Sequence, residues 1–114
     1  ETEDKTCIVI DDICDTAGSL VAGCEILKRH GAKDIYTGIT HGVFSRDAIA
    51  KIENSPITKM VITDTIPLRE DQKASTTKIQ VLSIAEMLAN TIESIENHTP
   101  VSKVYEEYSF DSFK

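Results

Sequence analysis

Short apolar runs alternate along the chain with stretches in which apolar residues recur at helical spacing. Each run is followed by polar or turn-forming residues, as expected of buried strands in a parallel sheet. The predicted strands are residues 7–10, 35–40, 59–63 and 79–82. Because strands that alternate with helices favour right-handed crossovers, we predict an α/β fold: a doubly wound parallel sheet with helices on both faces.

Helix start and stop signals separate the first three predicted strands. The first helix is predicted over residues 16–30, with Gly31 placed to end it in a left-handed conformation. A second, short helix is expected to follow a Ser45 cap and to stop at the Asn, Ser and Pro of residues 54–56. These two helices would connect the strands on which the candidate chemistry lies.

The second half of the chain is less regular. Residues 69–78 are polar and predict a surface loop. The tetrad at residues 83–86, Ser-Ile-Ala-Glu, predicts a capping box that opens a helix with apolar residues at helical spacing as far as Ile95. Residues 101–110 have β-branched and aromatic character and predict a strand or hairpin. Residues 1–114 are expected to form one domain.

Composition excludes several classes of partner. The net charge is −7, from 12 Lys and Arg against 19 Asp and Glu. No basic stripe is present, so we expect neither nucleic acid nor a membrane surface as partner. No apolar run approaches the roughly 20 residues that cross a bilayer. The three cysteines, Cys7, Cys14 and Cys24, lack the spacing of a disulfide framework or zinc site, and reduced thiols favour a cytoplasmic location.

The candidate chemistry follows the first predicted strand. The acidic pair Asp11 and Asp12 ends that strand, and a loop of small polar residues then leads into the first helix, namely Asp15, Thr16, Ala17, Gly18 and Ser19. Backbone N–H groups, two hydroxyls and the positive end of a helix suit a phosphate ester. The acidic pair suits the vicinal hydroxyls of a sugar, or helps to hold Mg²⁺. A sugar phosphate satisfies both halves, whereas the alternative is that the pair merely ends a strand and caps a helix.

Ligands of such sheets bind beyond the carboxyl ends of the strands, so we expect residues 11–19, 40–45 and 63–67 to share one edge, or rim. Three further residues near this edge are candidates for a role. His41 follows the second strand and is a secondary acid–base candidate, although a hydrogen-bonded structural role is favoured. Cys14 is either a reactive thiol or, as we favour, an apolar filler. Arg46 is the cation nearest to the predicted edge. None of the three lies in a motif that specifies its chemistry.

The acidic pair and its loop resemble the signature of type I phosphoribosyltransferases. Two further segments narrow the resemblance: Thr-His-Gly-Val-Phe-Ser at residues 40–45 and Val-Ile-Thr-Asp-Thr-Ile-Pro at residues 61–67. Both look like segments of ribose-phosphate pyrophosphokinase, also called phosphoribosyl pyrophosphate synthetase. The resemblance covers the chain from about Asp4 to Tyr105.

The resemblance implies a reaction and a set of binding residues. The family transfers the diphosphoryl group of ATP to ribose 5-phosphate with Mg²⁺, which gives phosphoribosyl pyrophosphate and AMP. By this resemblance Asp11 and Asp12 contact the ribose hydroxyls. They would contact magnesium only where the ion is bound to the ribose. The loop of residues 15–19 holds the 5-phosphate. Ser102 is a possible secondary residue, because many members place two serines around a Val in a regulatory phosphate site and Pro100 replaces one of them here.

The resemblance also implies that the chain is the carboxyl-terminal part of a longer polypeptide. The beginning, at Glu1, has neither an initiator Met nor the layout of a signal peptide and suggests an internal cut. We expect the ATP pocket, the metal ligands and the catalytic basic loop to belong to a missing amino-terminal domain. The chain alone would then be inactive, and the full-length protein would be a homo-oligomer. Residues 45–48, Ser-Arg-Asp-Ala, depart from the family's common Ser-Gly-Pro-Ala.

Two other functions compete with this interpretation. One is a non-catalytic subunit that associates with an active synthetase and regulates it. Such relatives typically lose the phosphate loop, which is intact here at residues 15–19. The other is a phosphoribosyltransferase proper, against which the segments at residues 40–45 and 61–67 argue.

Overall fold

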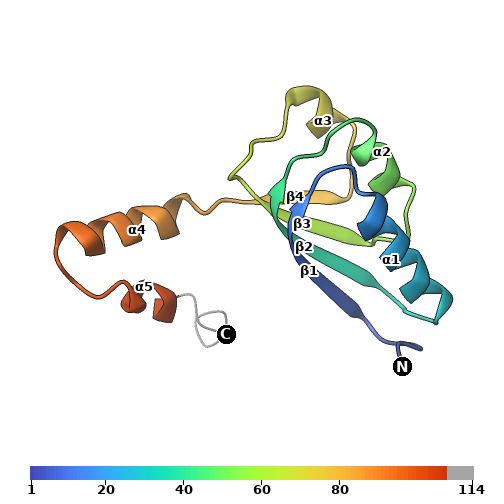
Figure 1. The fold of residues 1–114 in the computed structure, drawn as a ribbon, viewed down its shortest axis with the longest axis horizontal. Coiled ribbons are helices and arrows are strands. Elements are labelled where there is room, and N and C mark those ends of the chain that lie inside the picture. Colours follow the sequence, from blue (N-terminus) through green and yellow to red (C-terminus); the bar gives the residue numbers. More distant parts are fainter. Residues whose placement is uncertain (108–114) are drawn as a thin grey trace. The chain divides into compact units, whose positions relative to one another are not determined.

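A computed structural model of the chain describes residues 1–107 and shows strands alternating with helices (Figure 1). The strands are β1 (Cys7–Cys14), β2 (Ile35–Gly42), β3 (Lys59–Thr63) and β4 (Ile79–Leu82). The helices of the described residues are α1 (Gly18–Arg29), α2 (Ala48–Glu53), α3 (Glu70–Ala74), α4 (Ala85–Glu96) and α5 (Ser102–Glu107). The chain divides into two compact units, of which the first is Glu1–Leu82 and the second begins at Ser83. The single domain over residues 1–114 stays a prediction.

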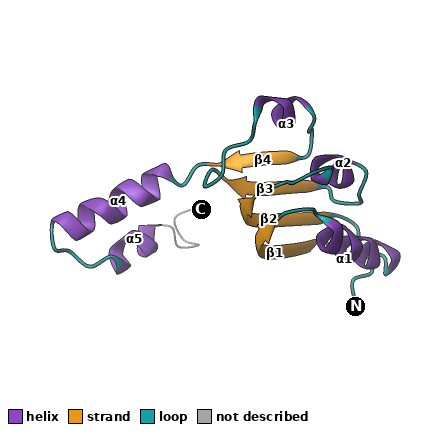
Figure 2. Ribbon diagram, turned by 45° about the horizontal axis from the view of Figure 1, so that its top comes forward, coloured by secondary structure: helices purple, strands orange, loops and turns teal. Residues whose placement is uncertain are grey.

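The four strands form one parallel sheet in the order β1-β2-β3-β4 (Figure 2). The α/β class and the parallel sheet are thereby confirmed. The prediction that Asp11 and Asp12 end the first strand is wrong, because β1 stays paired with β2 as far as Cys14 and contains both residues. Helices α1 and α2 lie on the same face of this sheet (Figures 1 and 2). The strand order explains this placement, because right-handed crossovers between successive neighbours leave every connection on one side, and double winding needs a reversal of strand order. The expected helices on the second face are not found within the unit Glu1–Leu82.

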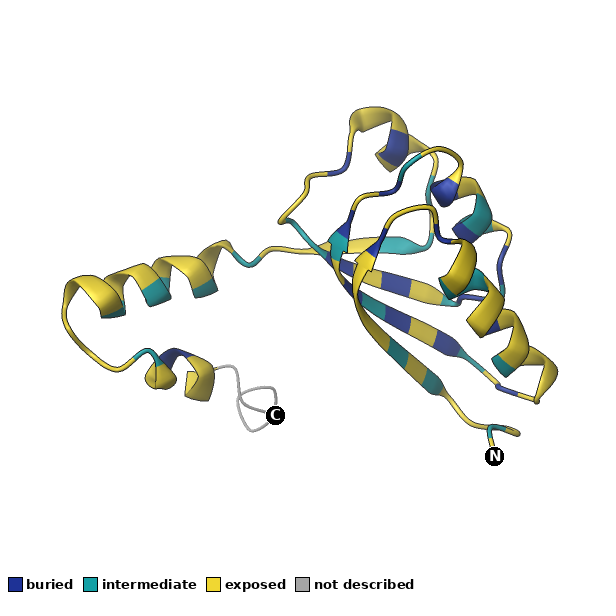
Figure 3. Cartoon of the chain, in the orientation of Figure 1, coloured by how far each residue is buried: buried dark blue, intermediate teal, exposed yellow. Residues whose placement is uncertain are grey.

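Alternation along the strands separates a buried face from an exposed one (Figure 3). On the face that carries the helices, the sheet contributes buried residues that pack with buried residues of α1 and α2: Ile35, Ile39, Met60, Ile62, Cys24, Ile49 and Ile52. On the opposite face, Ile8 and Ile10 of β1 are 70% and 75% exposed. The core of this unit therefore lies between the sheet and one layer of helices.

The prediction of a loop over residues 69–78 is wrong at Glu70–Ala74, which form α3. The backbone N–H of Arg69 donates to Oε1 of Gln72 at 3.0 Å, which satisfies one free donor at the helix start. Gln72 is buried, and its Nε2 donates to the carbonyl of Phe44 at 3.3 Å. Hence a glutamine in a polar stretch anchors one short helical turn, which polarity alone does not indicate.

The start of α2 also differs from its prediction. Helix α2 begins at Ala48 with Asp47 at the cap, and no side chain caps it. Ser45 contributes only its carbonyl, which accepts a hydrogen bond from the N–H of Ala48 at 3.2 Å. The Ser45 cap is therefore wrong, whereas the end of the helix before residue 54 and the left-handed Gly31, with φ 89°, are confirmed.

In the second unit the predicted helix is confirmed as α4. The predicted capping box at residues 83–86 is wrong, because Ile84 occupies the cap of this helix and has no side-chain group that could cap it. Its apolar residues Leu88, Ile92 and Ile95 are 50–65% exposed. The predicted strand or hairpin at residues 101–110 is wrong over Ser102–Glu107, which form α5, and its last three residues lie outside the described residues. None of the helices described is long and apolar enough to span a bilayer.

Gly42 tests how tightly the end of β2 is packed. A methyl carbon added at Gly42 would lie 2.5 Å from Cε2 of Phe44, whose ring is buried. We expect Gly42→Ala to lower the free energy of unfolding by about 1–3 kcal/mol, because the ring must move. Gly23→Ala in α1 is the matched control: the added carbon meets nothing within 4 Å, and a helix interior should gain about 0.5–1 kcal/mol. Chemical denaturation measures both, and equal stability of the two variants would contradict the packing described.

Candidate functional site

The carboxyl ends of three strands meet at one edge of the sheet. Ile13 of β1 pairs with His41 of β2, and the hydroxyl of Thr63 at the end of β3 donates to the carbonyl of Thr40. Ligands of parallel α/β sheets bind beyond this edge. The prediction that residues 11–19, 40–45 and 63–67 share one rim agrees with these contacts.

The loop of residues 15–19, here called the phosphate loop, surrounds a hollow of about 220 Å³. All five loop residues line this hollow, and Asp11 lines it with them. Asp12 is exposed and is not among the lining residues, although its N–H donates to Oδ1 of Asp11 at 2.8 Å. The structure thus brings together six of the seven residues predicted to hold the sugar phosphate and sets Asp12 outside the hollow.

Neighbouring residues hold the carbonyl groups that precede and enter the phosphate loop. The N–H groups of Val43 and Phe44 donate to the carbonyl of Cys14 at 3.0 and 3.2 Å, and the N–H of Ser45 donates to that of Asp15 at 3.0 Å. In a trans peptide the carbonyl and the following N–H point in opposite directions. The N–H groups of Asp15 and Thr16 therefore point away from residues 43–45.

Helix α1 begins directly behind the loop. Its cap, Ala17, is buried and left-handed, with φ 67°. No side chain caps the helix, and its first turn contains no acidic residue. The positive end of α1 is thus not neutralised by a side chain of its own first turn, which is the arrangement that suits an anion.

Cys14 lies beneath the loop as a buried thiol with 3% of its surface exposed. Burial raises its pKa to about 11, and the negative charges of Asp11 and Asp15 act in the same direction. The N–H of Ala17 opposes this shift. A thiol with so high a pKa stays protonated near neutral pH and is a poor nucleophile, which supports the filler role over the reactive one.

The other predicted residues are not among those that line the hollow. His41 is hydrogen-bonded through Nδ1 to Oγ1 of Thr65 at 2.7 Å, as its structural role requires. Ser102 begins α5, in the second unit. Arg46 is exposed and has a positive φ of 56°. The backbone therefore keeps at Arg46 a left-handed conformation that glycine, the common residue of the resembling family, adopts without strain.

Sequence reasoning missed Lys51. Its Nζ donates to the carbonyl of Thr16 at 3.4 Å and lies 3.4 Å from Oδ1 of Asp47. The four-residue spacing of Asp47 and Lys51 on a helix is a recognisable signal for their ion pair. Contact with the phosphate loop across 35 positions has no such local signal.

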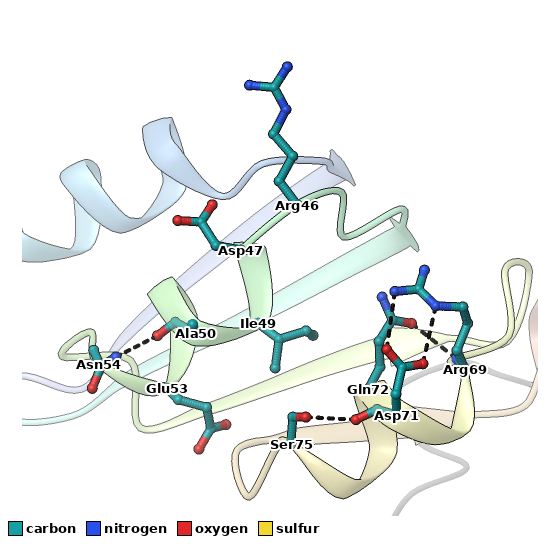
Figure 4. A pocket seen from close by; sticks show the side chains of 10 residues that line it. All are labelled: Arg46, Asp47, Ile49, Ala50, Glu53, Asn54, Arg69, Asp71, Gln72 and Ser75. Carbon is teal, nitrogen blue, oxygen red and sulfur yellow. Dashed lines mark hydrogen bonds and ion pairs between the residues drawn. The ribbon is translucent and has the colours of Figure 1, made fainter.

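A larger hollow, of about 430 Å³, lies between α2 and α3 (Figure 4). Several of its polar side chains bind one another or nearby backbone: Arg69 pairs with Asp71, and Ser75 donates to the carbonyl of Asp71. Arg46 extends away from the other lining residues in Figure 4. Because these polar groups already have partners within the protein, size alone does not make this hollow the site.

Magnesium has few ligands to choose from in this chain. Among residues 1–107 no group of three or more His, Cys, Asp or Glu side chains could hold a metal ion. Asp11 offers an exposed carboxylate at the hollow, and the exposed Asp12 lies outside its lining. One or two carboxylates together with substrate oxygens are a usual magnesium environment, so Asp11 fits an ion that arrives with its substrate.

Fold and hollow define an α/β domain with an anion-suited loop at the carboxyl edge of a parallel sheet. The model of one protein family, described as "Phosphoribosyl synthetase-associated domain", matches residues 1–106. The chain belongs to this family.

Individual relatives carry related names. The chain is 43% identical over 107 residues to a ribose-phosphate pyrophosphokinase of Clostridium acetobutylicum, which covers 94% of this chain and 33% of that protein. It is 46% identical over 105 residues to a ribose-phosphate pyrophosphokinase of Caldanaerobacter subterraneus, covering 92% and 33%. The crystal structure of phosphoribosylpyrophosphate synthetase from Mycobacterium smegmatis is similar with a TM-score of 0.80 and 36% identity, covering 85% of this chain and 32% of that one. The chain thus spans about a third of the length of these relatives.

The raised pKa of Cys14 predicts a loss of stability at alkaline pH. A thiol whose pKa rises from 9.0 to about 11 on folding contributes stability that is complete below pH 9 and is lost as the pH rises through 11. We expect the free energy of unfolding of wild type, relative to Cys14→Ala, to fall by about 2 kcal/mol over this range. Urea denaturation at pH 8, 9.5 and 11 measures it. A constant difference across these values would show that the thiol titrates normally.

Proposed function

We propose that the chain is the carboxyl-terminal, ribose 5-phosphate-binding domain of a ribose-phosphate pyrophosphokinase, with a type I phosphoribosyltransferase fold. The observation that carries this proposal is the hollow at the carboxyl edge of the sheet, which Asp11 and the whole phosphate loop line. The names of the relatives support a ribose phosphate as the substrate class. The full-length protein would transfer the diphosphoryl group of ATP to ribose 5-phosphate and form phosphoribosyl pyrophosphate.

The phosphate loop would bind the 5-phosphate through backbone groups. The N–H groups of Asp15 and Thr16 point away from the residues that hold their neighbouring carbonyls, and the uncapped start of α1 adds positive potential. An added Cβ at Gly18 would meet nothing within 4 Å, so the backbone there is open to close approach by a ligand. The hydroxyls of Thr16 and Ser19 are exposed and available as further donors.

The acidic residues would take the ribose end of the substrate. Asp11 borders the hollow, and its carboxylate would accept hydrogen bonds from the vicinal hydroxyls. Asp12 would contribute from outside the hollow. When bound, magnesium would neutralise the charge of the diphosphoryl group, and the two carboxylates would hold it together with substrate oxygens.

The remaining parts of the reaction would come from elsewhere in the longer polypeptide. We propose that an amino-terminal domain supplies the ATP pocket and the catalytic basic groups, so that the chain alone makes no product. We further propose a cytoplasmic homo-oligomer for the full-length protein. Positioning and charge neutralisation dominate phosphoryl transfer, and this chain would provide the positioning of one substrate.

A non-catalytic subunit that associates with an active synthetase is the second candidate. The description of the matching family, a synthetase-associated domain, favours it. The intact phosphate loop favours substrate binding instead, because a purely associating subunit has no use for the hollow. Turnover of ATP and ribose 5-phosphate by the full-length protein distinguishes the two.

Gly18→Asp tests the phosphate loop directly. A carboxylate at this position would place negative charge where the phosphate needs backbone amides. We expect calorimetric titration to show weak binding of ribose 5-phosphate to the wild-type chain and none to Gly18→Asp. Gly23→Asp adds the same charge later in α1, where the added Cβ also meets open space, and should bind like wild type.

Two outcomes of this titration would contradict the site. Equal affinity of wild type and Gly18→Asp would remove the phosphate loop from binding. Loss of binding in both aspartate variants would show that net charge, and not the loop, sets the affinity.

Asp11→Asn and Asp12→Asn separate the ribose contacts from the phosphate contacts. A charge-assisted hydrogen bond is worth about 1.5–3 kcal/mol, so Asp11→Asn should weaken ribose 5-phosphate binding roughly 10- to 100-fold. Asp12→Asn should have a smaller effect, because Asp12 does not line the hollow. Inorganic phosphate has no sugar hydroxyls. Its affinity, measured by competition with ribose 5-phosphate, should therefore be the same in either variant as in wild type. A normal affinity of Asp11→Asn for ribose 5-phosphate would return the acidic pair to a structural role.

A further inference from the structure

The hollow of the phosphate loop contains more negative than positive side chains. Asp11 and Asp15 line it, and no Lys or Arg of the described residues does. Among residues 1–107, Lys51 is the one cationic side chain with a hydrogen bond to a phosphate-loop residue, the carbonyl of Thr16. Lys51 itself lies on α2 and is not among the lining residues.

The contact at Thr16 completes a series. The carbonyls of Cys14 and Asp15 are held by backbone N–H groups of residues 43–45, and the next carbonyl, that of Thr16, is held by the Lys51 side chain. Three successive carbonyls thus bind to the connection between β2 and α2 or to α2 itself. Because carbonyl and following N–H are opposed in a trans peptide, this fixes the direction of the N–H groups of Asp15 and Thr16. The N–H of Ala17, in the peptide whose carbonyl Lys51 holds, faces the Cys14 thiol.

Lys51 is itself held in place. Its ammonium lies 3.4 Å from the carboxylate of Asp47, one helical turn earlier, and its side chain is 40% exposed. An ammonium placed between a carboxylate and a backbone carbonyl has a restricted set of positions. Lys51 is therefore directed to the outer side of the loop peptide.

We propose that Lys51 is a positioning residue of the phosphate loop, which keeps the Thr16 carbonyl turned away from the bound phosphate. This inference rests on the proposed function, since it names how the same site is shaped. Without the ammonium, the peptide after Thr16 loses the partner of its carbonyl. An oxygen turned toward the hollow would then repel the phosphate.

The test compares three variants with wild type by calorimetric titration of inorganic phosphate and of ribose 5-phosphate. Lys51→Met keeps the length of the side chain and removes its charge and donors. We expect it to weaken the binding of both ligands by a similar factor, about 5- to 20-fold, because both bind through a phosphate. The Tm should change little. Lys51→Arg restores a donor and should bind within about 3-fold of wild type. Lys73→Met, which removes an exposed ammonium paired with Glu70 on α3, should change neither ligand.

Asp47→Asn separates positioning from direct charge attraction. If Lys51 acted by charge on the phosphate, neutralising Asp47 would strengthen binding. As a positioning residue, Lys51 loses its anchor, and binding should weaken about 2- to 5-fold. A ligand-free readout supports the comparison: the Thr16 carbonyl ¹³C resonance should shift in Lys51→Met and return toward its wild-type position in Lys51→Arg.

The outcomes distinguish this inference from the function on which it rests. Normal affinity of Lys51→Met in a chain whose wild type binds ribose 5-phosphate would overturn the role of Lys51 and leave the proposed function intact. Stronger binding by Asp47→Asn would also overturn it, in favour of a direct charge effect. A wild-type chain that binds neither ligand would overturn both, because no phosphate would then be positioned.

Discussion

The hydrogen bonds from residues 43–45 to the carbonyls of Cys14 and Asp15 are the constraint on which the candidate site depends. They form only because β1 and β2 are parallel neighbours in a register that ends with Cys14 opposite Gly42. Both strands end at the same level of the sheet, so the turn after β2 lies against the turn after β1. The direction of the phosphate-loop peptides is thus set by strand pairing, and the loop sequence alone does not set it.

The connection after β2 can donate these hydrogen bonds because of its unusual backbone. Phe44 and Arg46 both have positive φ, at 50° and 56°. The Phe44 ring is buried and sits above Gly42, where a Cβ would overlap it. Left-handed residues other than glycine cost of order 1–3 kcal/mol and persist where packing determines them. Burial of Phe44 supplies that packing and turns successive N–H groups toward β1.

The apolar runs predicted the positions of all four strands of the first unit, because short runs of consecutive apolar residues bounded by polar ones favour strands. The phosphate loop was also predictable, since its small residues are adjacent in sequence and form a single local motif. Helix α3 was not, because Gln72 anchors it by binding Phe44, which lies 28 positions away. The contact of Lys51 with Thr16 is equally non-local. For Asp12, closeness in sequence to Asp11 did not indicate closeness to the hollow. Asp11 borders the hollow, but successive side chains of a strand lie on opposite faces, so Asp12 is not among the lining residues.

Bound phosphate is expected at the phosphate loop, and backbone amide resonances report on that position most directly. In a ¹⁵N-labelled chain titrated with ribose 5-phosphate, the amides of residues 15–19 should show the largest shifts and saturate together. The amides that border the larger hollow between α2 and α3, from Arg69 to Ser75, should stay unchanged. Saturating shifts at Arg69 to Ser75 with none at residues 15–19 would contradict the assignment of the site.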